Sequence, residues 1–152
     1  MIELVWETDI RAAPERVFSL LAELRDYERW LPGSSAFRGT HKISDGPIGI
    51  GTTYVEPGPF GVRHGKVTEY EPPQRLAFEQ PMTMRPKAFG TIGIRLWMTL
   101  TPDGDTVHVT RKLQLDPRGP VKLLMPAVLP AFRSENVRMM KTLKAYAESD
   151  QP

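Results

Sequence analysis

Alternating apolar and polar residues divide most of the chain into short segments typical of β-strands. The first predicted strand carries its less polar residues at every second position: Ile2, Leu4, Trp6, Thr8 and Ile10. Further strands are predicted over 36–43, 51–56, 61–70, 75–80, 91–101 and 106–115, with turns rich in glycine, proline and aspartate between them. Asp103-Gly104 is typical of a type I′ hairpin. The middle of the chain is therefore predicted to be an antiparallel meander.

Helical spacing follows the first predicted strand. Pro14 suits the first position of a helix, and apolar residues then recur in the helical pattern Val17, Phe18, Leu21 and Leu24. A second short helix through Tyr27 and Trp30 is expected to end at Pro32-Gly33.

A long amphipathic pattern closes the chain after Asp116-Pro117. Its predicted apolar stripe consists of Val121, Met125, Val128, Phe132, Val137, Met140, Leu143 and Tyr146. Pro126 and Pro130 are expected to kink or break the first part of this helix, because proline lacks the amide hydrogen that the helical ladder needs.

The order of these elements predicts an α+β fold. One strand, two short helices, a run of strands and a long helix favour a sheet with helices on one face. We therefore expect a helix-grip fold, in which a seven-stranded curved antiparallel sheet wraps around the C-terminal helix. We expect a single domain over 1–148 and a short tail over 149–152.

Composition excludes several classes of function. Twenty Lys and Arg against 18 Asp and Glu give a net charge of +2, which does not indicate a nucleic-acid partner. The chain has no cysteine, so disulfides, thiol catalysis and cysteine-bound zinc are excluded. The first ten residues do not resemble a signal peptide, and the apolar stretch 121–132 is too short to span a bilayer. We expect a cytoplasmic protein.

No motif for a metal, a cofactor or nucleophilic catalysis is present in the sequence. His41, His64 and His108 lie far apart, without the spacing that zinc sites use. GxSxG, Walker and GxGxxG motifs are missing as well. We therefore expect neither a metal nor a cofactor.

Pairing across the Asp103-Gly104 turn indicates which side chains face inward. If residue pairs flank this turn, Leu100 lies opposite Val107 and Leu96 lies opposite Arg111. Arg111 would then be the only charged residue on the inward face of its strand.

The same reasoning at Pro72-Pro73 places Glu69 opposite Leu76, with Glu69 and Arg63 facing inward. Tyr54 is expected opposite Arg63, and His41 on the same face as Phe37. Glu69 with Arg111 or Arg63 would form an internal pair, serving either as a structural ion pair or as polar anchors for a ligand. A single β-bulge would invert any of these assignments.

Three segments resemble a known superfamily. They are residues 10–32 (IRAAPERVFSLLAELRDYERWLP), residues 67–78 (VTEYEPPQRLAF) and the helix start at Pro117-Arg-Gly-Pro-Val. Together they resemble the START-like, birch-pollen-allergen-like superfamily, and within it the polyketide cyclase/dehydrase and lipid transport group. The resemblance implies a large, mostly apolar cavity between the sheet and the long helix. Known members include lipid and hormone carriers, aromatase/cyclases and stress- or chaperone-associated proteins, and no shared catalytic triad or metal motif is implied.

The expected function is binding, including transport, of a small apolar, lipid-like or polycyclic molecule in this cavity. The candidate ligand-binding residues are Trp6, Tyr54, Arg63, Glu69, Phe78, Leu96, Val109, Arg111, Met125 and Phe132. The segments 81–90 and 117–130 are expected to control access, because they carry methionines and other apolar residues at one end of the sheet.

Three alternatives remain open from the sequence. A polyketide aromatase/cyclase or dehydratase would use Tyr54, Glu69 and Arg111 as catalytic groups. An interaction module would bind a protein partner and no ligand. Transient contact with a membrane surface is a further possibility, since 117–130 is apolar and carries Arg118 and Lys122.

Overall fold

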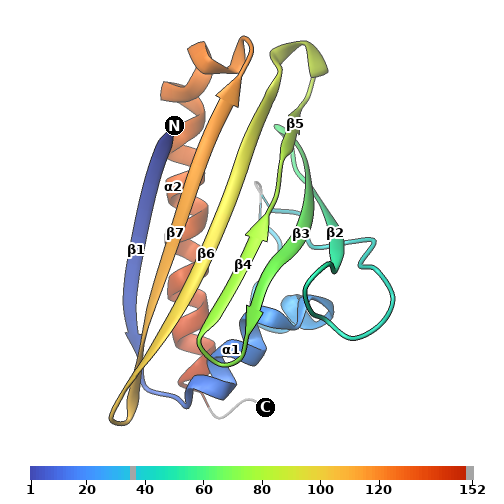
Figure 1. Cartoon of the computed structure of the whole chain (residues 1–152). Helices are drawn as coiled ribbons and strands as arrows, with labels where there is room; N and C mark the ends of the chain where they lie inside the picture. The colour runs from blue at the N-terminus through green and yellow to red at the C-terminus, as the bar shows by residue number, and fades with distance from the viewer. Residues whose placement is uncertain (35–36, 150–152) are drawn as a thin grey trace.

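Seven antiparallel strands form one sheet, and a long C-terminal helix packs across it (Figure 1). The computed structural model describes residues 1–34 and 37–149. The strands are β1 (Ile2–Ile10), β2 (Thr53–Pro57), β3 (Gly61–Glu71), β4 (Arg75–Glu79), β5 (Met82–Met84), β6 (Thr91–Asp103) and β7 (Thr106–Arg118). Their order in the sheet is β1-β7-β6-β4-β3-β2, and β5 pairs with both β3 and β6.

The described residues also form two helices and two 3₁₀ turns: α1 (Pro14–Ala22), η1 (Leu24–Arg29), η2 (Lys87–Phe89) and α2 (Val121–Ala147). The predicted α+β class and the helix-grip arrangement are confirmed. The predicted C-terminal tail starts two residues after the end of α2, and beyond Ser149 it lies outside the described residues.

The prediction of a strand over 36–43 is wrong. Ala36 lies outside the described residues, and 37–43 contains only an isolated bridge between His41 and Val55. Gly39 and Lys42 have φ values of 91° and 49°, which an extended strand does not permit. His41 is exposed, so its predicted inward position beside the buried Phe37 is also wrong.

The seventh strand is instead β5, which lies within the segment predicted as a loop. Only three residues long, it pairs with Gly61–Arg63 on one side and with Thr91 and Ile92 on the other. A strand this short gives too few alternations for a sequence pattern to detect.

Helix α2 continues through Pro126 and Pro130 rather than breaking there. Each proline lacks the amide hydrogen that would bond to the carbonyl four residues earlier, at Lys122 and Pro126. All three residues are exposed on the same side of the helix, so water can satisfy the two freed carbonyls. The buried side of the helix keeps its ladder.

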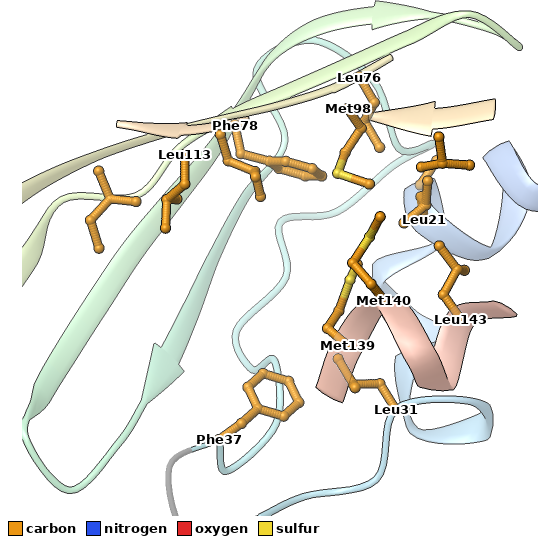
Figure 2. Close-up of a cluster of buried hydrophobic side chains, with 14 of the residues drawn as sticks. Leu21, Leu31, Phe37, Leu76, Phe78, Met98, Leu113, Met139, Met140 and Leu143 are labelled. Carbon is orange, nitrogen blue, oxygen red and sulfur yellow. The ribbon is translucent and has the colours of Figure 1, made fainter. Parts of the chain in front are cut away.

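The core lies between the inner face of the sheet, α1 and α2. Figure 2 shows Leu76 and Met98 of the sheet pointing toward Leu21 of α1 and toward Met140 and Leu143 of α2. All five side chains are at most 5% exposed. No helix within the described residues is long and apolar enough to cross a membrane.

One histidine on the outer face sits between two carboxylates. His108 of β7 pairs with Asp9 of β1, and its Nδ1 lies 2.8 Å from Asp9 Oδ1. Its Nε2 lies 3.1 Å from Glu7 Oε1. Only the imidazolium form donates from both nitrogens at once, so these hydrogen bonds raise the pKa of His108 above its ordinary value.

The first prediction concerns this histidine. A pKa that is higher in the folded than in the unfolded state adds to the free energy of unfolding. This contribution is fully present below the unfolded-state pKa of about 6.5, and it is lost as the pH rises through the folded-state pKa. The difference in Tm between wild type and His108→Gln should therefore be larger at about pH 6 than at about pH 9. His64→Gln, at an exposed position of β3, is the matched control. A difference for His108→Gln that does not change with pH would contradict the assignment.

Candidate functional site

Two adjoining chambers lie between the sheet and the helices. The inner chamber has a volume of about 90 Å³ and lies among α1, η1, α2 and the inner face of the sheet. The outer chamber, about 60 Å³, opens between the β2–β3 loop and α2. Five residues line both chambers: Glu56, Arg63, Phe132, Glu135 and Asn136. The cavity is thus smaller than the usual range of roughly 300–1,000 Å³ for ligand pockets, and the residues shared by its two chambers are polar except for Phe132.

Arg111 projects from β7 into the inner chamber. It lies opposite Met98 on β6 and opposite Trp6 on β1. The hairpin turn is Gly104-Asp105 rather than Asp103-Gly104, so every pair is shifted by two residues from the predicted register. Because side chains alternate with period two, this shift leaves the facing unchanged, and the inward position of Arg111 is confirmed.

The guanidinium of Arg111 is held by groups that carry no charge. Its Nε donates to Asn136 Oδ1 at 2.6 Å, and Nη1 lies 3.4 Å from Met98 Sδ. Within residues 1–34 and 37–149 it forms no ion pair with a carboxylate. Burial lowers the pKa of Arg111 to about 10, so the side chain is still a cation at neutral pH. Arg111 therefore presents a positive charge to the chamber that no ion pair compensates in the described residues, unlike Arg63, which pairs with Glu56.

Glu56 and Arg63 form an ion pair where the two chambers meet. The residues lie opposite each other on β2 and β3, and Arg63 Nε is 3.5 Å from Glu56 Oε1. Thr40 Oγ1 donates to the other carboxylate oxygen at 2.7 Å. Glu56 is only 8% exposed, so these two partners compensate a buried charge.

Tyr54 lies across Gly65, not across Arg63 as expected. This pairing too is displaced by two residues, so Tyr54 still faces inward and lines the inner chamber. A Cβ atom on Gly65 would come within 2.0 Å of Tyr54 Cζ, so glycine is what lets the ring lie flat against β3. The edge of the ring packs on Phe78, with ring centroids 6.0 Å apart.

Two phenols in the chamber differ in their bonding. The Tyr27 hydroxyl donates to the backbone carbonyl of Leu21. The Tyr54 hydroxyl makes no hydrogen bond to any residue in the described part of the chain. Burial, and next the charge of Glu56, raise the pKa of Tyr54 well above its ordinary value, so this hydroxyl stays protonated. Tyr54 can donate a hydrogen bond to a molecule in the chamber.

The prediction that Glu69 faces inward is wrong. A β-bulge between Val67 and Glu69 shifts the β3–β4 register, so Glu69 lies opposite Ala77 and turns outward. Its carboxylate is 3.2 Å from Arg75 at the surface, so it pairs with neither Arg111 nor Arg63. Tyr70 takes the inward position and packs its ring against Phe18.

The remaining predicted ligand-binding residues divide into two groups. Phe78, Leu96 and Phe132 line the inner chamber, as do Tyr54, Arg63 and Arg111. Val109 and Met125 are buried in the core and line neither chamber. Trp6, half-buried on the edge strand β1, also lies outside both chambers.

Sequence reasoning missed five polar residues of the inner chamber: Tyr27, Glu56, Gln80, Glu135 and Asn136. Two of them left a signal. Glu56 is two residues from Tyr54 in the predicted strand 51–56, so alternation puts both on one face. Asn136 falls on the apolar stripe of α2 between Phe132 and Met140, four residues from each, whereas the predicted member Val137 is 38% exposed.

No group of three or more His, Asp or Glu side chains in the described ranges could hold a metal ion. The inner chamber itself offers the Arg111 cation, the Glu56–Arg63 ion pair, the carboxylate of Glu135, two phenols and side-chain amides.

The fold and the cavity define a helix-grip protein with small internal chambers. Residues 1–148 match the family described as polyketide cyclase / dehydrase and lipid transport, and the chain belongs to this family. No curated protein matches the chain in a sequence comparison.

Solved structures of low sequence identity share the fold. MLL2253 from Mesorhizobium loti is 18% identical, with 99% of this chain and 100% of that chain covered and a TM-score of 0.70. Norcoclaurine synthase from Thalictrum flavum, in complex with dopamine and hydroxybenzaldehyde, is 14% identical, with coverage of 99% and 88% and a TM-score of 0.72. The Aha1 dimer from Colwellia psychrerythraea is 16% identical, with coverage of 95% and 97% and a TM-score of 0.61.

The second prediction tests the packing of Tyr54 on Gly65. Gly65→Ala should lower the free energy of unfolding by roughly 1–3 kcal/mol, the usual cost of overpacking a core, because the new methyl group overlaps the Tyr54 ring. Gly93→Ala on β6 is the matched control, since its Cβ would meet Asp116 Cβ at an ordinary 3.5 Å. Urea unfolding of both variants checks this, and equal effects would show that Tyr54 does not depend on Gly65.

Proposed function

We propose that this protein binds a small molecule with an apolar, lipid-like or polycyclic body and an oxygen-bearing end, in the cavity between the sheet and α2. The observation that carries the proposal is Arg111. Its guanidinium lies in the inner chamber, bonded to Asn136 and Met98 and without a carboxylate partner in the described part of the chain. A half-buried cation with no carboxylate within ion-pair distance is poorly compensated, and a ligand carbonyl, carboxylate or enolate would supply the missing partner.

The Tyr54 hydroxyl supports the same orientation of the ligand. It is a protonated donor in the same chamber as Arg111 and has no hydrogen-bond partner among the described residues. Gln80 adds a side-chain amide at 7% exposure. A few polar groups in a mostly apolar cavity are how such sites fix a ligand's orientation.

The apolar body of the ligand would extend past Phe78, Leu96 and Phe132 toward the outer chamber. At about 90 Å³ the inner chamber alone is smaller than the 150 Å³ or so that holds benzene in an engineered cavity, so the ligand would use both chambers. Met82 and Met98 line this path, and methionine adapts its shape readily.

The third prediction separates binding from stability at Arg111. Arg111→Met should weaken binding of octanoate roughly ten- to a hundredfold, which corresponds to losing one charge-assisted hydrogen bond. Binding of octanol should change much less. The Tm should stay close to that of wild type, because the substitution also removes a half-buried cation that has no carboxylate within ion-pair distance. Titration calorimetry and thermal unfolding check the two parts.

Arg95→Met is the matched control, because Arg95 is exposed on the outer face of β6. It should leave the binding of both probes unchanged. A large loss of stability in Arg111→Met with octanoate binding intact would show that Arg111 is structural, and failure of both probes to bind wild type would count against the binding site itself.

A second candidate function is catalysis by a polyketide aromatase/cyclase or dehydratase. It is favoured by one observation: a phenol donor, a cation and a carboxylate line the same chamber, at Tyr54, Arg111 and Glu56. Arg111 would stabilise an enolate, Tyr54 would protonate an oxygen, and the chamber would hold a reactive poly-ketone in a productive fold. Glu56 takes the place that the sequence assigned to Glu69.

The fourth prediction tests this reaction. If the protein turns over a poly-β-ketone mimic, Tyr54→Phe and Glu56→Gln should each lower kcat by roughly a hundredfold or more, as expected for loss of an acid or base group. Glu69→Gln, a surface carboxylate 39% exposed, should have no effect and is the matched control. Binding without turnover in wild type would exclude this alternative and leave the carrier function.

A further inference from the structure

Three connections meet at one end of the sheet. We call this end the tip and define it as residues 58–60, 85–90 and 118–124, from the β2–β3, β5–β6 and β7–α2 connections. The Arg85 amide donates to the Phe60 carbonyl at 2.9 Å. Gly90 packs so closely on the next connection that a Cβ would lie 2.1 Å from the Arg118 carbonyl oxygen. Figure 1 shows the β5–β6 connection and the start of α2 at this same end.

The tip concentrates exposed apolar side chains. Phe60 is 49% exposed, Phe89 40%, Leu123 85% and Leu124 38%. These are four of the eight large hydrophobic residues exposed in the described part of the chain, although the tip makes up only a small share of that part. Single exposed hydrophobic residues are common, but a group of them at one end marks a contact surface.

Cations surround these apolar side chains. Arg85, Lys87, Arg118 and Lys122 are all exposed, and the three tip segments contain no acidic residue. The carboxylate next to the tip, Asp116, pairs with Arg118 at 3.1 Å. The tip is therefore strongly basic, although the chain as a whole has a net charge of only +2.

The opposite end of the sheet is not basic. Its two tight turns carry the carboxylates of Glu71, Asp103 and Asp105, while Arg75 lies opposite Glu71 and Arg11 lies 3.9 Å from Asp105. This difference in charge between the two ends would orient the protein with its tip toward a negatively charged surface.

We propose that the tip docks on the anionic surface of a lipid bilayer. The cations meet the lipid phosphates while Phe60, Phe89, Leu123 and Leu124 enter the headgroup region, which is how basic, apolar surfaces bind bilayers. Phe60 also lines the outer chamber, so the docked protein would hold the mouth of its cavity at the lipid surface. This inference rests on the tip alone and does not depend on what Arg111 binds.

A bilayer fits this surface better than a protein or nucleic-acid partner does. The apolar groups and the cations are intermixed over three short connections. The hollow beside Arg85 and Lys87 includes none of the four exposed apolar side chains, and the outer chamber includes only Phe60. A nucleic acid would contact the cations but would leave two leucines without a role. Binding driven by negative charge alone, whatever its source, is an outcome of the test, which uses heparin as the lipid-free polyanion.

The fifth prediction is measured by co-sedimentation with sucrose-loaded vesicles. Wild type should bind vesicles of equal parts phosphatidylcholine and phosphatidylglycerol, bind phosphatidylcholine vesicles weakly, and dissociate as salt is raised. Lys87→Gln and Lys122→Gln should each weaken binding about fivefold, the change expected for one cation near an anionic surface. Phe89→Ser with Leu123→Ser should weaken it further at constant charge.

The matched controls alter similar residues away from the tip. Ile50→Ser removes a side chain that is 71% exposed beside the middle of β3, and Lys141→Gln removes a cation from the far half of α2. Both should bind like wild type. The proposal is overturned if wild type does not bind the mixed vesicles, or if the controls lose as much affinity as the tip variants. It is also overturned if heparin binds the protein as well as the vesicles do while the Phe89→Ser, Leu123→Ser variant keeps full affinity for vesicles. If Arg111→Met loses octanoate binding but still binds vesicles, the ligand site and the membrane-docking tip act independently of each other.

Discussion

The packing of α2 against the inner face of the sheet is the constraint on which the rest of the structure depends. The buried side of this helix carries Met125, Met139, Met140 and Leu143, and the sheet contributes a continuous inward row from each long strand. Burying a side chain of this size contributes about 1.5–3 kcal/mol, so the helix and the sheet are stable only together. A cavity between them exists where that packing is incomplete, around Phe132, Asn136 and Met139.

Polar side chains occupy the incomplete part of this interface, and several of them are held in place by neighbouring residues. Asn136 illustrates the arrangement: its side-chain amide donates to the Phe132 carbonyl at 2.8 Å, which fixes its oxygen toward Arg111. The Glu56 carboxylate is fixed by Thr40, from the segment before β2, and by Arg63 of β3. Arg111 has no ion-pair partner in the described residues, and the side chains of Tyr54 and Gln80 form no hydrogen bond there. That asymmetry distinguishes the groups available to a ligand from those that maintain the fold.

The two ends of the sheet have separate physical characters. Tight polar turns join the strands at one end, whereas longer connections with exposed apolar and basic residues lie at the other, next to the outer chamber. A meander forces this division, because alternate connections of antiparallel strands fall on alternate ends. The placement of a cavity mouth and a basic, apolar tip at one end therefore follows from the topology.

The sequence by itself determined the α+β class, the long helix and the inward position of Arg111. A register error of two residues leaves every side chain on the same face of the sheet. The turn predicted at Asp103-Gly104 was therefore wrong without changing the predicted inward position of Arg111. Tertiary structure alone decided the rest. The bulge after Val67 turns Glu69 outward. The positive φ values of Gly39 and Lys42 are incompatible with the strand predicted over 36–43. The short strand β5 forms because β3 and β6 both pair with it. Glu56 and Asn136 became site residues because strand pairing and helix packing brought them to one chamber, and such contacts between distant segments leave only weak traces in local sequence patterns.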